Sequence, residues 1–165
     1  MADDLIELLL GIAPQDRLGA LRRRRPEALR HAEGAFRELL LPADPGRLSL
    51  SERATVALRI AAAERCEPLA LVFRALLERA GAAALAERAE AAEIAGEDRL
   101  AALLRYAEKA GLRPHEVSQA DTDALSALGL GPREIVALTQ IVAFVPYQVR
   151  LLAGLAALQQ EQAQQ

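Results

Sequence analysis

Residues 64–81 read ERCEPLALVFRALLERAG and contain the only cysteine of the chain, Cys66. Pro68 is well placed in the first turn of a helix, because the N–H groups of that turn have no intrahelical partner. Gly81 is a typical residue for ending one. The apolar residues between them recur at helical spacing on one broad face: Leu69, Val72, Phe73, Leu76 and Leu77. The stretch therefore predicts an amphipathic helix with Cys66 at its start.

The preceding residues, 48–63, predict a second helix that leads directly into Cys66. Ser49 and Glu52 have the spacing of a capping box, in which a serine hydroxyl and a glutamate carboxylate bind the free N–H groups of the first turn. Val56 and Ile60 then continue an apolar face at helical spacing. We expect Cys66 at the junction of two consecutive helices.

The N-terminal region predicts two more helices. Asp3 and Asp4 can cap a short first helix that ends near Gly11. Pro26 suits the first residue of a helix over 26–40, which should stop before the loop PADPG at 42–46. We expect residues 1–46 to form an N-terminal helical arm.

The C-terminal half continues the helical pattern. An Ala- and Glu-rich helix should extend to Ile94, and the next should end at Gly111. A short helix, a tight turn at 129–131 and a long apolar helix from Pro132 should follow, with Pro146 kinking or breaking the long helix. The polar residues 159–165 should form a frayed tail.

Composition agrees with one all-α domain over 1–165. The chain is 52% hydrophobic but only 3% aromatic, and Ala and Leu dominate. A net charge of −3 argues against a nucleic-acid partner, and the short run Arg22–Arg25 is expected to be a solvated helix end. The acidic, short apolar start argues against a signal peptide or membrane partner, so we expect a cytoplasmic protein.

The cysteine and histidine content of the chain does not indicate metal or cofactor chemistry. One cysteine excludes an internal disulfide, and two histidines without nearby metal-ligand spacing do not predict a metal site. His31 and His115 are expected at the surface, and no cofactor is expected. The apolar helix after Pro132 also argues against a DNA-reading helix-turn-helix over 118–145.

Two segments resemble one known family. The helical pair at 48–81 and the segment 103–155, with its YAEK helix and its later GL…EI hairpin, resemble the carboxymuconolactone decarboxylase superfamily, in its alkylhydroperoxidase-D-like, peroxidase-related branch. The likeness covers residues 47–158, the expected family-like core. It implies an alkylhydroperoxidase-D-like helical bundle that assembles as a homo-oligomer.

The resemblance also implies where catalytic residues should lie, and most are missing. Active members have a glutamate on the first core helix, a CxxC motif at its end and a histidine one turn later. Here Cys66 takes the first cysteine position, whereas Leu69 replaces the second, Phe73 the histidine and Ala54 the glutamate. A dithiol peroxidase needs a resolving thiol and a proton relay, so the resemblance implies a degenerate active site.

Three functional interpretations remain open. The first is a non-catalytic or regulatory homo-oligomer, working beside a catalytically intact relative. The second is a single-cysteine peroxidase or thiol-dependent reductase that uses Cys66 with an external reductant, helped by the helix N-terminus and Arg65. The third is a binder of a small apolar ligand. A free cysteine among apolar neighbours is more often buried than reactive, which favours the first interpretation.

Overall fold

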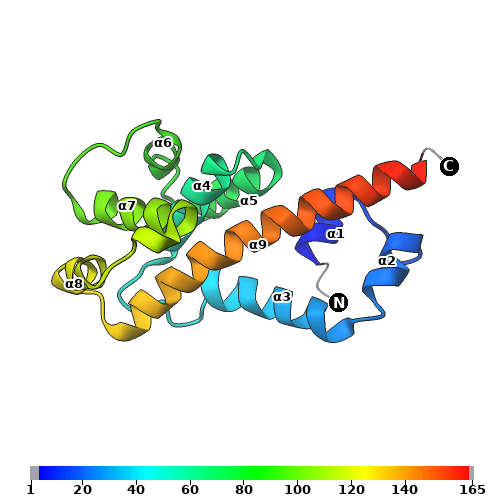
Figure 1. Cartoon of the computed structure of the whole chain (residues 1–165), viewed down its shortest axis with the longest axis horizontal. Coiled ribbons are helices and arrows are strands. Elements are labelled where there is room, and N and C mark those ends of the chain that lie inside the picture. The colour runs from blue at the N-terminus through cyan, green and yellow to red at the C-terminus, as the bar shows by residue number, and fades with distance from the viewer. Residues whose placement is uncertain (1–3, 164–165) are drawn as a thin grey trace.

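The computed structural model describes residues 4–163 and confirms the all-α prediction, with nine α-helices, one 3-10 turn and no strand in that range (Figure 1). The elements are α1 Leu5–Leu10, α2 Arg17–Arg22, α3 Pro26–Leu40, α4 Leu50–Ala63, α5 Glu67–Arg79, α6 Leu85–Glu90, α7 Arg99–Leu112, η1 Pro114–Glu116, α8 Gln119–Ala127 and α9 Pro132–Ala163.

Two helices, α4 and α9, organise the core. Helix α4 packs against α5, α6, α7 and α9, while α9 also contacts α1, α2, α3 and α8. In Figure 1 the long α9 crosses the molecule, with α4–α8 grouped toward its start and α1–α3 along its other end. The largest buried side chains of the two central helices include Leu58, Ile60 and Leu138. Burial of these apolar faces supplies the main stabilising term.

Local start and stop signals were predicted well. The Ser49 and Glu52 capping box is present, and Asp4 caps α1 by accepting a hydrogen bond from the Glu7 amide at 3.0 Å. Asp3, the other expected cap, lies outside the described residues. Gly11 ends α1 with a φ of 64°, a left-handed conformation that glycine adopts without a steric penalty.

Two helix ends differ from expectation. Helix α6 stops at Glu90, so the helix does not reach Ile94 and residues 91–98 form a loop. Gly111 lies inside α7 rather than after it, and a Cβ there would stand 3.5 Å from Cγ1 of Val142. Pro114, which disfavours a helical residue before it, follows the actual end.

Of the two outcomes expected at Pro146, a kink or a break of the last helix, the break is wrong, because α9 runs through Pro146 to Ala163. Pro146 is buried, and packing of α9 against the other helices offsets the backbone hydrogen bond that a proline cannot donate. The expected frayed tail, 159–165, is helical as far as Ala163, and Gln159 donates to the Leu10 carbonyl at 3.1 Å. Residues 164–165 lie outside the described range.

One helix in the described part of the chain, over Pro132–Glu161, is long and apolar enough to cross a membrane by length and composition alone. Of the 18-residue apolar stretch of this helix that meets the criterion, only 39% is buried within the single chain. The absence of a membrane partner therefore stays a prediction.

The arginine run 22–25 was expected to be solvated, but two of its four side chains form ion pairs within the fold. Arg22 and Arg23 point at the buried carboxylates of α1, with Arg22 Nη1 2.8 Å from Asp4 Oδ1 and Arg23 Nη2 2.7 Å from Glu7 Oε2. Only Arg24 and Arg25 are solvent-exposed. These ion pairs hold α2, a helix that the sequence pattern did not reveal, against α1.

Candidate functional site

Cys66 lies between α4 and α5, as predicted. It is the N-cap residue of α5, is half-buried and packs against the core, and its side chain makes no capping hydrogen bond. The tight turn before it places Arg65 at a φ of 55°, a conformation that a non-glycine residue adopts rarely. The Cys66 amide donates to the Ala61 carbonyl at 2.9 Å. The backbone thus fixes the thiol at the end of a continuous two-helix unit.

The three residues expected in the other catalytic positions belong to the hydrophobic core. Leu69 is 0% exposed, and Phe73 and Ala54 are each 1% exposed. All three pack in one cluster with Cys66 at its edge. None has a side chain that can titrate or form a disulfide, so these three positions supply neither a resolving thiol nor a proton carrier.

Charged groups beside Cys66 in sequence are paired with one another. Glu67 accepts from Arg74 Nη1 at 2.7 Å, and Arg74 also pairs with Glu90. These bonds lower the pKa of the Glu67 carboxyl and raise that of the Arg74 guanidinium. On the other side, Arg150 of α9 approaches Glu64 at 3.7 Å. Both guanidiniums therefore have carboxylate partners.

Residues 4–163 contain no candidate metal site, because no group of three His, Cys, Asp or Glu side chains lies close enough together to hold a metal ion. His31 on α3 and His115 in η1 are both exposed, as predicted. Nε2 of His31 lies 3.6 Å from Oε2 of Glu27, one helical turn earlier.

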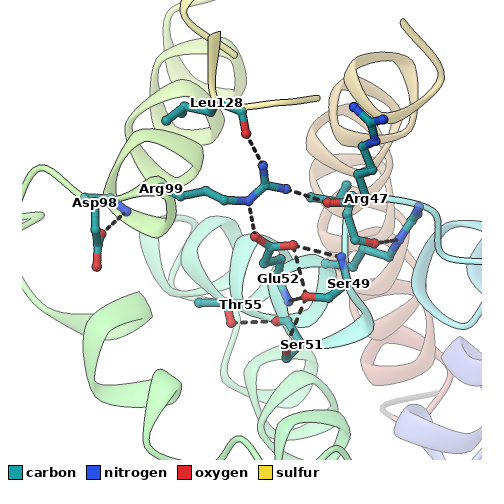
Figure 2. Close-up of polar contacts among 11 residues, drawn as sticks. Arg47, Ser49, Ser51, Glu52, Thr55, Asp98, Arg99 and Leu128 are labelled. Carbon is teal, nitrogen blue, oxygen red and sulfur yellow. Dashed lines mark hydrogen bonds and ion pairs between the residues drawn. The ribbon is translucent and has the colours of Figure 1, made fainter. Parts of the chain in front are cut away.

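The opposite end of α4 carries a polar cluster that sequence analysis did not predict. Figure 2 shows Arg99 reaching from the start of α7, with its Nε 2.7 Å from Oε1 of Glu52 and its Nη1 2.6 Å from the Leu128 carbonyl. Its Nη2 donates to the Arg47 carbonyl. Glu52 also accepts from the Ser49 amide at 2.8 Å. One guanidinium thus links the loop before α4, the start of α7 and the end of α8.

A second arginine, Arg53, is 4% exposed and binds only backbone oxygens. It donates to the carbonyls of Leu39, Pro45 and Leu48 at 2.8–3.0 Å. Burial lowers the pKa of the Arg53 guanidinium. Its role is to satisfy the carbonyls at the end of α3 and in the following loop.

A third arginine, Arg59, lies 8% exposed on α4 and pairs with Glu108 of α7, with Nε 2.9 Å from Oε2. It also donates to the Ala89 carbonyl at 3.2 Å, which ties the end of α6 to α4. The sequence did offer a signal for the contacts of Arg53 and Arg59, because both arginines lie among apolar residues of the helix that became α4. All three arginines hold helices together, and each makes at least three hydrogen bonds to partners within the chain.

Comparison with known proteins supports the fold. No family model matches the chain, and no curated protein matches it. Several solved structures resemble it, and two of them each share 22% sequence identity with it. One is an uncharacterized peroxidase-related protein from Silicibacter sp. TM1040, with a TM-score of 0.69 over 79% of this chain and 69% of that chain.

The other is an uncharacterized peroxidase-related protein from Ralstonia eutropha JMP134, described as an alkylhydroperoxidase AhpD core, with a TM-score of 0.70 over 93% of this chain and 84% of that chain. At this identity the likeness establishes the fold, and chemistry must be argued from the residues present. The chain therefore has the alkylhydroperoxidase-D-like all-α fold.

Proposed function

We propose that this chain is a non-catalytic member of the carboxymuconolactone decarboxylase superfamily, with a structural or regulatory role beside a catalytically intact relative. The observation that supports the proposal is the burial of Leu69, Phe73 and Ala54 in the hydrophobic core, with Leu69 and Phe73 on the helix that begins after Cys66. In this fold an apolar core occupies the positions where the resemblance places a thiol, a histidine and a glutamate.

The chemistry of peroxide reduction explains why this burial matters. A thiolate that attacks a peroxide oxygen becomes a sulfenic acid, and a second thiol must then form a disulfide with it to complete the cycle. Leu69 cannot supply that thiol, and Phe73 cannot carry a proton. Cys66 oxidised once would therefore stay oxidised within a single chain.

The test is peroxide consumption by the purified chain, with Cys66→Ser as the matched variant. Without added thiol, we expect the wild type and Cys66→Ser to consume hydrogen peroxide and cumene hydroperoxide at the same background rate. Sustained turnover in the wild type that disappears in Cys66→Ser would contradict the proposal. Mass spectrometry of the product reports whether Cys66 has been oxidised.

One observation favours the second interpretation, a single-cysteine enzyme. Cys66 is half-buried rather than fully buried, and it occupies the N-cap position of α5, at a helix end where backbone N–H groups favour an anion. This alternative predicts turnover only when a thiol such as dithiothreitol is added, again with complete loss in Cys66→Ser. The same assay with and without dithiothreitol separates the two proposals.

We further propose that the chain forms a homo-oligomer through α9. The exposed side of this helix carries Val136, Ala143, Tyr147 and Leu158, with Val136 56% and Tyr147 48% exposed. A helix of this hydropathy usually buries such a face, and a second copy would cover it with the same face.

Light scattering at micromolar concentration tests the assembly. We expect a multiple of the 17.7 kDa chain mass for the wild type and a smaller species for Tyr147→Glu, which places a charge on the exposed face of α9. Leu71→Glu is the matched control, because Leu71 is 57% exposed on a different helix, α5. A monomeric wild type, or equal dissociation by both variants, would contradict an interface on α9.

A further inference from the structure

The exposed face of α9 is symmetric about Tyr147. Val136 and Leu158 are 56% and 44% exposed, and each lies 11 residues from Tyr147 along the helix. Eleven residues make three helical turns, so the three side chains lie on one line, with about 16 Å between neighbours. Gln140 and Gly154, seven positions from Tyr147 on either side, are also exposed and uncharged. We call these five residues the α9 stripe.

This symmetry lets the α9 stripe pack against a copy of itself in the opposite direction. With a two-fold axis at Tyr147, Val136 lies opposite Leu158 of the second copy, so the two outer apolar side chains cover each other. Gln140 lies opposite Gly154 of the second copy, where nothing lies within 4 Å of the position of a Cβ. The long side chain thus meets the residue that leaves most room for it.

Helix α3 adds charges beside the stripe. Tyr147 lines two open hollows between α3 and α9, one with Ala32 and Arg25 and the other with Ala35 and Glu38. Tyr147 is therefore level with the part of α3 between Ala32 and Ala35. At the rise of an α-helix, Arg25 lies roughly 13 Å to one side of this level and Glu38 roughly 7 Å to the other.

The same two-fold axis brings these opposite charges together. An axis that reverses α9 keeps α3 on the same side of both copies, so the start of one α3 faces the end of the other. Arg25 and Glu38 are exposed and form no ion pair within residues 4–163, whereas the neighbouring Arg23 and Arg30 are paired with carboxylates. The long arginine side chain can span the remaining offset of roughly 6 Å along the helix. Charges of opposite sign across an interface fix its register.

We propose that two copies of this chain pair antiparallel through the α9 stripe, with the two-fold axis at Tyr147 and with Arg25 of each copy bound to Glu38 of the other. The pair rests on the α9 interface proposed above and adds its direction, its register and its charged contacts. It uses no residue of the Cys66 region.

Site-specific cross-linking tests the direction of the pair, in a Cys66→Ser background so that each added cysteine is the only thiol. A short bismaleimide should join Gln140→Cys chains to Gly154→Cys chains when the two are mixed, because these positions face each other. Gln140→Cys alone should not be joined, since its two copies would lie about 21 Å apart. Leu71→Cys, at a 57% exposed position on α5, is the matched control and should remain a single chain.

Charge exchange tests the contacts of α3. Glu38→Arg and Arg25→Glu each place like charges opposite one another and should weaken the pair about tenfold in analytical ultracentrifugation. Mixing the two variants should restore the wild-type affinity, because each contact across the mixed pair again joins opposite charges. Glu93→Arg, at an exposed position of the loop after α6, is the control and should not change the affinity.

Failure of this pairing and failure of the assembly give different results. A monomeric wild type in light scattering would contradict the α9 interface itself, and if that monomer sedimented with phosphatidylglycerol vesicles, a membrane would replace the second copy. An oligomer in which Gln140→Cys alone is cross-linked would overturn the antiparallel direction but leave the α9 interface standing. An oligomer whose affinity is not restored by mixing the charge variants would overturn the contact between Arg25 and Glu38.

Discussion

The two ends of α4 contrast in chemistry. At its start, Glu52 and the guanidinium of Arg99 form a polar cluster that joins three segments (Figure 2). At its end, Cys66 adjoins a core containing Leu69 and Phe73, where the family resemblance would place a thiol and a histidine. One end is held by directional bonds and the other by apolar packing.

The contrast teaches what charge does in this protein. Arg53, Arg59 and Arg99 bind carboxylates or backbone carbonyls that link neighbouring helices. Their partners are already present, so these groups have a structural explanation. The thiol end, by comparison, has the buried apolar side chains Leu69 and Phe73 next to Cys66 in sequence. The predictions below test whether each end has the role assigned to it.

The largest effect is expected at the thiol end. Phe73→Ala removes a 1% exposed aromatic side chain and should lower the free energy of unfolding by about 3–5 kcal/mol, because the cavity is not refilled. Urea denaturation measures the change. Leu71→Ala, at a 57% exposed position of the same helix, should change the value by less than about 0.5 kcal/mol. Similar costs for the two variants would show that Phe73 is not a core residue.

A smaller loss is expected at the polar end. Arg99→Met keeps much of the side-chain length but removes the bonds to Glu52 and to two carbonyls, and it should cost about 1.5–3 kcal/mol. Arg105→Met is the control, because its carboxylate partner Glu97 is 92% exposed and such pairs contribute about 0–1 kcal/mol. Equal losses in thermal or urea unfolding would argue against a special role for the cluster.

The capping box of α4 should contribute less again. Ser49→Ala removes the hydroxyl that accepts from the Glu52 amide at 3.2 Å, at a cost of about 1 kcal/mol. Ser126→Ala, at an exposed position within α8, provides a comparison in which no N-cap is lost. If Ser49→Ala were as stable as Ser126→Ala, the Ser49 cap would not contribute to the stability of the start of α4.

The smallest effect concerns acid stability near the polar end. Arg88 donates to Asp98 and lowers the pKa of that carboxyl to about 2, below the value near 4 of an unfolded chain. The ionised form therefore stabilises the fold above about pH 4, and that contribution disappears as the pH falls through about 2. Urea midpoints measured from pH 6 to pH 2 should fall less in Asp98→Asn than in the wild type. An identical pH profile would contradict this linkage.

Prediction from sequence succeeded where the signal was local. Ser49 and Glu52 are three residues apart, and Pro26 and Pro132 mark helix starts through their own backbone geometry. The expected break at Pro146 is wrong, because packing against several other helices stabilises α9 in spite of the proline. The apolar nature of positions 54, 69 and 73 could be read directly, but their shared burial required the fold.

The sequence by itself determined the helical class, the position of Cys66 between two helices and the lack of a second thiol, since these depend on residue identity and short-range spacing. Only the tertiary structure decided which charged residues bind one another, because Arg59 and Glu108 are 49 positions apart and meet through helix packing. It also decided that Gln148 is buried, with an Oε1 atom that has no hydrogen-bond partner among residues 4–163. Burial and hydrogen bonding between distant segments depend on how whole helices pack, which no local pattern records.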